Sequence, residues 1–193
     1  MFIWGNGPSL LGMVDLLPKC LPAFCCNRMV QWKDLPITPT YYACNLTKVD
    51  EGSEPASPPH QKAKFLCTYR EESRDGWTMV RKGRQKPLAG LGDSLPFVRT
   101  RGTMAFVMVQ IALWLGFEEL YLLGAEQRGI GHVFDPEGKV TPFMPVEETQ
   151  MEQEWKTLKE YAESAGRSLL DCTPGGRLNA ILGYEPLRRV LNG

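Results

Sequence analysis

The chain has 193 residues, long enough for one domain with a sizeable core, and its 43% hydrophobic and 23% charged residues are typical of a globular protein. Its 22 basic residues balance 22 acidic ones, so net charge gives no reason to expect nucleic acid or a membrane surface as a partner. A local basic cluster can still serve a phosphorylated ligand.

Cysteine spacing and apolar runs indicate the cellular compartment. The six cysteines contain no C-x-x-C pair, which argues against a zinc site and favours buried thiols in a reducing cytosol. Because the first apolar run is short and has no charged n-region, we expect no signal peptide. The longest apolar run, 104–115, contains Gln110 and is shorter than the ~20 residues of a membrane span. We therefore expect a cytoplasmic protein without a transmembrane segment.

The first part of the chain is predicted to alternate short strands with turns. A short helix over 9–17 follows the first strand and ends at Pro18. The stretch 50–59, rich in Pro, Ser and Glu, is predicted to be a surface loop. The predicted strands of this part cover 1–5, 23–26, 40–44, 63–69 and 77–80.

The second part carries the strongest pattern. Residues 81–102 are polar and rich in Gly and Pro, which predicts a long loop. Residues 103–115 are apolar on nearly all sides, as in a buried helix, and Gly116 is placed to end it. A buried strand at 120–124, an amphipathic helix at 151–165 and a strand at 168–172 complete the expected elements.

Strands that alternate with helices predict one α/β domain over 1–193, with a Rossmann-like, mainly parallel sheet and helices on both faces. Mobile loops are expected at about 50–62 and 81–101. Such sheets bind ligands at the carboxyl ends of their strands. That rule selects Gly5, Asn6, Gly7, Asn27, Asn45, Gly124, Glu126, Thr173, Gly175 and Gly176.

The turn Gly5-Asn6-Gly7-Pro8-Ser9 has two interpretations. Glycines allow close approach of a ligand, and the amides of a following helix N-terminus can bind a phosphate. Alternatively, the segment is only a tight turn, with Ser9 as the N-cap of the helix.

Two further groups near predicted strand or helix ends are candidates for ligand contact. Asn27 and Asn45 are either turn residues or amides that recognise a cytosine edge or sugar hydroxyls. Arg101, Gly102 and Thr103 precede the apolar helix. Arg101 is suited to a phosphate or is a solvated charge, and Thr103 can cap the helix or bind the phosphate.

Several segments occur in the order and spacing of one bacterial family: GNGPSL, CCNR, TPTYYACN, GTMAFVMVQIALWLGFEELYLLG, GHVFDP and AGRSLLDCTPGGRL. Over nearly its whole length the chain resembles the hydroxymethylpterin diphosphokinase-like family, which is related to the bacterial sialyltransferases of glycosyltransferase family 42. The resemblance implies a nucleotide or nucleotide-sugar ligand. In the sialyltransferases, the loop matching Asn6 contacts the donor nucleotide.

The resemblance also implies catalytic roles. A histidine in the region of His132 is the general base toward the acceptor hydroxyl in sialyltransferases, and Asp135 can orient it or help to bind a metal. Alternatively, His132 is a hydrogen-bonded structural residue of a loop. The chain departs from the family after Gly124, where Ala125, Glu126 and Gln127 replace an Asp followed by aromatic residues. Tyrosines that assist departure of the donor phosphate have no obvious counterpart, so either a group such as Arg101 or Arg128 stabilises the leaving phosphate or the donor is a different one.

Three hypotheses follow. The leading one is a glycosyltransferase that moves a sugar from a donor such as a CMP-sugar to a glycan or other small acceptor, with no metal required, in polysaccharide biosynthesis. The second is an ATP-dependent pyrophosphokinase whose Mg²⁺ is held by Glu126 and Asp135. The third is a noncatalytic nucleotide-binding module. All three hypotheses are compatible with a homo-oligomer.

Overall fold

The computed structural model describes residues 1–17, 21–27, 29, 32, 39–46, 63–68, 73–83, 97–99, 103–126, 133 and 145–192. Its centre is an eight-stranded sheet in the order β6-β5-β4-β3-β2-β1-β7-β8, and every neighbouring pair is parallel. The strands are β1 (Phe2–Trp4), β2 (Ala23–Cys26), β3 (Tyr41–Asn45), β4 (Ala63–Thr68), β5 (Thr78–Gly83), β6 (Phe97–Arg99), β7 (Glu119–Leu123) and β8 (Ser168–Asp171).

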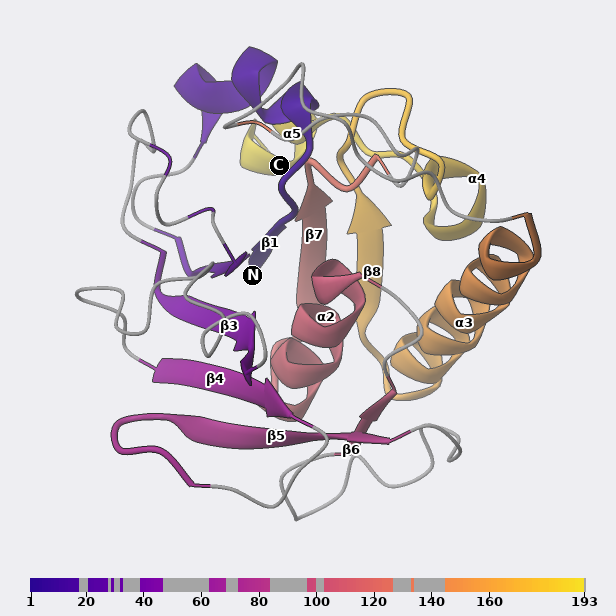
Figure 1. Cartoon of the computed structure of the whole chain (residues 1–193). Coiled ribbons are helices and arrows are strands. Elements are labelled where there is room, and N and C mark those ends of the chain that lie inside the picture. Colours follow the sequence, from indigo (N-terminus) through magenta and orange to yellow (C-terminus); the bar gives the residue numbers. More distant parts are fainter. Residues whose placement is uncertain are drawn as a thin grey trace.

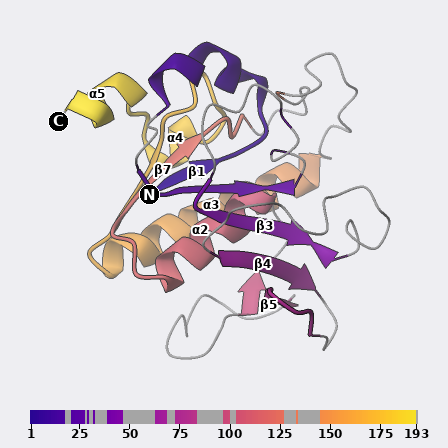
Figure 2. The same ribbon diagram turned by 90° about the vertical axis from the view of Figure 1, so that its left-hand side faces the viewer.

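Helices cover the two faces of this sheet, as Figures 1 and 2 show. The helices are the 3-10 helix η1 (Pro8–Leu16), α2 (Met104–Trp114), α3 (Pro145–Ser164), α4 (Asn179–Leu182) and α5 (Leu187–Asn192). Along β1, Ile3 faces the cluster that contains α2 and α3, whereas Phe2 and Trp4 face the cluster that contains η1 and α5. Because successive side chains of a strand point to opposite faces, both layers are anchored to the same short strand.

The predicted α/β fold with a parallel sheet is confirmed. Helix α2 is buried over most of its length because its residues are apolar except for Gln110, whose amide donates to Phe106 O. Gly116 follows α2 with a φ of +89°, the left-handed conformation expected of a residue that ends a helix. Five cysteines are free and buried, as predicted: Cys25, Cys26, Cys44, Cys67 and Cys172.

Some boundaries differ from the prediction. The helix after β1 is a 3-10 helix, and α3 begins at Pro145 rather than at Met151. The segment 81–102 was predicted to be loop, yet β5 continues to Gly83 and β6 occupies Phe97–Arg99. Pairing with β5 makes this short strand, because an edge strand gains ladder hydrogen bonds that its local composition does not indicate. Among the described residues, no helix is long and apolar enough to cross a membrane.

Candidate functional site at the strand ends

The glycine turn after β1 is interlocked with the end of β7. The Gly5 amide donates to Leu123 O at 2.7 Å, and the Gly7 amide donates to Gly124 O at 2.8 Å. A Cβ atom on Gly5 would lie 2.2 Å from Gly124 O, so only glycine fits there. The close approach that requires this glycine is therefore made by the protein's own backbone.

The second glycine of the turn makes room for a carboxylate. Glu126 Oε1 accepts a hydrogen bond of 2.7 Å from the Ser9 amide in the first turn of η1. A Cβ atom on Gly7 would lie 1.4 Å from Glu126 Oε2. Glu126 thus occupies the place at which a bound phosphate would accept the Ser9 hydrogen bond, and its charge is favourable at a helix N-terminus.

Polar atoms with unused hydrogen-bonding capacity occur after β2, after β7 and in the first turn of η1. Among the described residues, Glu126 Oε2, Ser9 Oγ and Asn27 Oδ1 are buried and have no hydrogen-bond partner. Leaving such an atom unpaired costs about 1–3 kcal/mol, and more when it is charged. A ligand that carries hydroxyl or amino donors would satisfy both carbonyl-type oxygens, and the serine hydroxyl can donate or accept.

The three candidate asparagines lie at the carboxyl ends of three consecutive strands of the sheet. Asn6 follows β1; its backbone carbonyl accepts from the Val133 amide at 2.7 Å, and its Oδ1 lies 3.9 Å from the Cys26 thiol. Asn27 follows β2 with a φ of +50°, and its carbonyl accepts from the Tyr42 hydroxyl at 3.1 Å. Asn45 is the last residue of β3 rather than the first residue after it.

The turn after β8 is attached to the turn after β7. The Ala125 amide donates to Thr173 Oγ1 at 3.0 Å, and the Arg177 amide donates to Glu126 O at 3.1 Å. Gly175 is exposed with a φ of +62°, and a Cβ there would meet no described atom within 4 Å, so the turn conformation explains this glycine. The Arg177 side chain is paired with Glu152 of α3 at 2.9 Å.

Beneath this turn lies a carboxylate that was not among the predicted site residues. Asp171 is fully buried at the end of β8 and accepts hydrogen bonds from the Thr173 amide at 2.9 Å and from Asn179 Nδ2 at 2.8 Å. Its pKa is raised to about 6, chiefly by burial; its hydrogen bonds oppose the increase, and the nearby charge of Glu126 adds to it. The available signal was a charged residue within the apolar strand Ser168–Asp171, since such residues are rarely buried unless they are partnered.

The remaining residues proposed for the site are Arg101, Gly102, Thr103, Arg128, His132 and Asp135. Arg101, Gly102, His132 and Asp135 lie outside the described residues, as does Arg128. Thr103 is in the N-cap position of α2, but its side chain makes no capping hydrogen bond to the helix. The predicted role of His132 as a base therefore stays a prediction. No group of three or more potential metal-ligating side chains occurs within the part of the chain that the structure describes.

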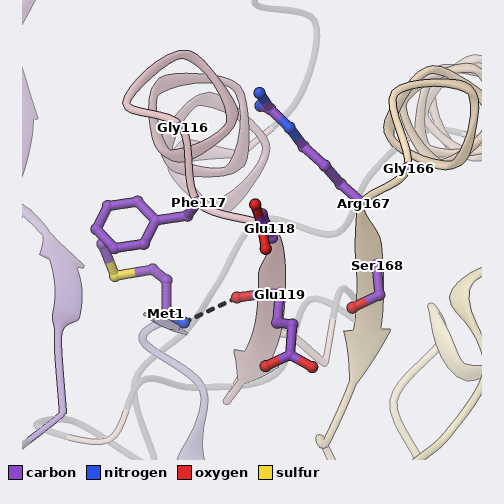
Figure 3. A pocket seen from close by; sticks show the side chains of 8 residues that line it. All are labelled: Met1, Gly116, Phe117, Glu118, Glu119, Gly166, Arg167 and Ser168. Carbon is purple, nitrogen blue, oxygen red and sulfur yellow. Dashed lines mark hydrogen bonds between the residues drawn. The ribbon is translucent and has the colours of Figure 1, made fainter.

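A separate cavity of about 710 Å³ lies at the opposite ends of the strands from the candidate site (Figure 3). Its walls are the turns that lead into β7 and β8, together with Met1, whose amino group donates to Glu119 O at 2.8 Å. Gly116 and Gly166, which follow α2 and α3, also line it. It is at the amino ends of these strands, so it is distinct from the candidate site.

The fold is that of α/β proteins with a parallel sheet, a class in which ligands commonly bind at the carboxyl ends of the strands. No protein-family model matches the sequence, and no curated protein matches it. Solved structures do match, over 96% of this chain.

Three of the matching structures are sialyltransferases. One is the sialyltransferase CstII from Campylobacter jejuni in complex with the substrate analogue cytidine-5'-monophosphate, with 15% identity, a TM-score of 0.59 and 84% of that chain covered. Another is a CstII variant in complex with CMP, at 14% identity and a TM-score of 0.57, with 86% covered.

A third is the monofunctional α-2,3-sialyltransferase Cst-I from the same bacterium, at 16% identity and a TM-score of 0.59, with 80% of that chain covered. At these identities the likeness establishes the fold. It agrees with the sialyltransferase part of the resemblance, while the pyrophosphokinase part has no support among these matches.

Proposed function

We propose that the chain is a glycosyltransferase that takes its sugar from a nucleotide-activated donor, with a CMP-sugar as the favoured donor. The observation that supports this most directly is the set of unpaired polar atoms on Ser9, Asn27 and Glu126, gathered where a parallel sheet binds its ligand. The likeness of the fold to sialyltransferases solved with CMP supports the choice of nucleotide.

The chemistry of the site fits a polyhydroxylated ligand better than a phosphate at the glycine turn. Glu126 already satisfies the Ser9 amide, and a second anion beside its buried charge would be repelled. A ribose or sugar hydroxyl, in contrast, can donate to Glu126 Oε2. The amides of Asn6, Asn27 and Asn45 are suited to the remaining polar edges of the nucleotide.

In the proposed reaction, His132 removes the proton from an acceptor hydroxyl, and that oxygen forms the new bond to the anomeric carbon of the donor sugar. The bond between this carbon and the phosphate oxygen breaks, and the nucleoside monophosphate leaves with the electron pair. Arg101 or Arg128 would stabilise the departing phosphate. Asp135 would orient the imidazole of His132. No metal is needed for this sequence, and the acceptor is a glycan.

Thermal denaturation with CMP, UMP, GDP and ATP, each with and without Mg²⁺, tests the donor class. We expect CMP without metal to raise the melting temperature by roughly 5–10 °C at saturating concentration. Stabilisation only by ATP with Mg²⁺ would instead favour the pyrophosphokinase. If no nucleotide stabilises the chain, the strand-end site does not bind nucleotides.

Substituting the proposed base tests catalysis separately from binding. His132→Ala should reduce sugar transfer by at least about 100-fold while leaving CMP binding intact. The matched control is His60→Ala, because His60 is the other histidine of the chain. Equal turnover in both variants would remove His132 from the mechanism. CMP binding without transfer or hydrolysis of any CMP-sugar by the unmodified chain would support the noncatalytic module.

A further inference from the structure

The buried carboxylate of Asp171 is held by hydrogen-bond donors although it lies beneath the site rather than in it. Asp171 is 0% exposed. Oδ1 accepts from the Thr173 amide at 2.9 Å, and Oδ2 accepts from Asn179 Nδ2 at 2.8 Å. A buried charge is tolerated only with such partners, so these groups and Asp171 must be placed together.

Thr173 connects this carboxylate to the end of β7. A hydroxyl has one proton to donate and lone pairs with which to accept. Asp171 Oδ1 accepts from the Thr173 backbone amide, and the Thr173 hydroxyl oxygen accepts from the Ala125 amide at 3.0 Å. The carboxylate therefore holds in place the residue whose hydroxyl accepts from Ala125.

The same turn holds Asp171 and Thr173 in one arrangement. Asn179 Nδ2 donates both to Asp171 Oδ2 and, at 3.1 Å, to the Thr173 carbonyl. A Cβ atom on Gly176 would lie 3.0 Å from Asp171 Oδ2, a distance that leaves little space for any other residue there. The turn is thus built closely around the carboxylate.

The contacts continue from Ala125 to the unpaired site oxygen. Ala125 precedes Glu126, whose carbonyl accepts from the Arg177 amide at 3.1 Å. The Ala125–Glu126 segment is consequently held through one amide and one carbonyl by the turn after β8. Glu126 then reaches the Ser9 amide with Oε1, which leaves Oε2 in the site.

We infer that Asp171 is a positioning residue: it holds the Thr173 backbone so that the Thr173 hydroxyl accepts from the Ala125 amide, and it thereby sets the position of the Glu126 carboxylate toward the nucleotide. The part of this inference that concerns nucleotide affinity rests on the proposed function. The part that concerns the Ala125 amide does not.

Amide hydrogen exchange tests the structural step without any ligand. Asp171→Asn replaces one acceptor oxygen by an NH₂ group, which in either orientation faces a donor. We expect exchange of the Ala125 amide to accelerate at least about tenfold, while the Gly5 amide, bonded to Leu123 O, keeps its protection. Unchanged protection of Ala125 would overturn the inference. Glu154→Gln is the matched control, because it makes the same chemical change at another buried carboxylate, on α3.

A double-mutant cycle on CMP affinity tests the functional step. Asp171→Asn and Thr173→Val should each raise the CMP dissociation constant about tenfold, and the double variant should be no weaker than either single one, because both act through the same contact. Thr173→Ser, which keeps the hydroxyl, should restore the affinity. Additive losses, or a Thr173→Val variant that binds like the unmodified chain, would contradict the inference.

The two tests separate the possible failures. If the unmodified chain binds no CMP, the proposed function fails, and exchange at Ala125 still decides whether Asp171 positions this segment. If Asp171→Asn does not fold, the comparison of Thr173→Val with Thr173→Ser, by exchange and by CMP affinity, decides it. Loss of protection in Thr173→Val but not in Thr173→Ser is the expected result, and equal protection in both would refute it.

Discussion

At the residue scale, the two glycines of the first turn are required by contacts within the protein. Gly5 leaves space for Gly124 O, and Gly7 leaves space for the Glu126 carboxylate. The phosphate interpretation rests on the close approach to the backbone that glycines allow a ligand. The structure adds that a carboxylate from a distant strand end already uses the space and the Ser9 amide.

Gly7→Ala should displace the Glu126 carboxylate, because the added Cβ would lie 1.4 Å from Oε2. Moving a buried carboxylate from its hydrogen-bond donor is expected to cost about 1–3 kcal/mol of unfolding free energy and to weaken CMP binding. Urea unfolding and calorimetric titration measure the two effects.

Gly12→Ala is the control for that substitution. Gly12 is within η1, and a Cβ there would meet nothing described within 4 Å. The change should leave CMP affinity as it is and should not destabilise the chain, because it restricts the unfolded state. Equal losses in both variants would show that the cost at Gly7 does not come from Glu126.

At the element scale, the end of α2 depends on one left-handed residue. Gly116 has a φ of +89°, which side chains disfavour, while the space around its Cβ position is open. Gly116→Ala should therefore lower the unfolding free energy by about 1 kcal/mol, and Gly116→Asn by less, because Asn tolerates this conformation better. Equal stability of the two variants in urea unfolding would contradict this assignment of the cost to the backbone.

The elements that could be predicted are those with a local signal. The uninterrupted apolar run of α2 and the short apolar strands before Asn27 and Asn45 carry such signals, and the rule for strand ends follows from them. Strand β6 has no adequate signal of its own, because its formation depends on pairing with β5. The continuation of β5 to Gly83 depends on the same pairing.

The candidate site residues were selected one by one from the predicted strand ends, without the contacts between them. Glu126 was selected as a strand-end carboxylate, whereas its bond to the Ser9 amide joins residues 117 positions apart. Periodicity and turn composition are local, so they contain no information about such a pair. Asp171 was assigned to a strand because it lies in the apolar run 168–172. Its burial follows only from the packing of α4 and the turn after β8.

At the scale of the whole molecule, the buried Asp171 couples folding to pH. Its pKa is about 6 in the folded chain, against an ordinary value of 3.8, so the folded state binds the proton more tightly. The stability contributed by this proton is fully present below the unfolded pKa and is lost as pH rises through the folded pKa.

The unfolding free energy of the unmodified chain, minus that of Asp171→Asn, should therefore fall by about 3 kcal/mol between pH 3.5 and pH 7. Urea unfolding of both proteins across this range measures it, and titrating groups common to the two cancel in the difference. A difference that does not change with pH would mean that Asp171 keeps an ordinary pKa in the folded chain.

The position of β1 has a consequence for the order in which the chain can assemble during synthesis. Phe2 pairs with Ala23 on one side and with Tyr121 on the other. At 5–20 residues per second, the roughly 100 residues between these partners take about 5–20 s to synthesise. During that interval the β7 side of β1 is an open edge, of the kind that recruits other chains. Strand β1, in the interior of the sheet, is thus the first of the eight strands to be made, and its second neighbour is synthesised much later.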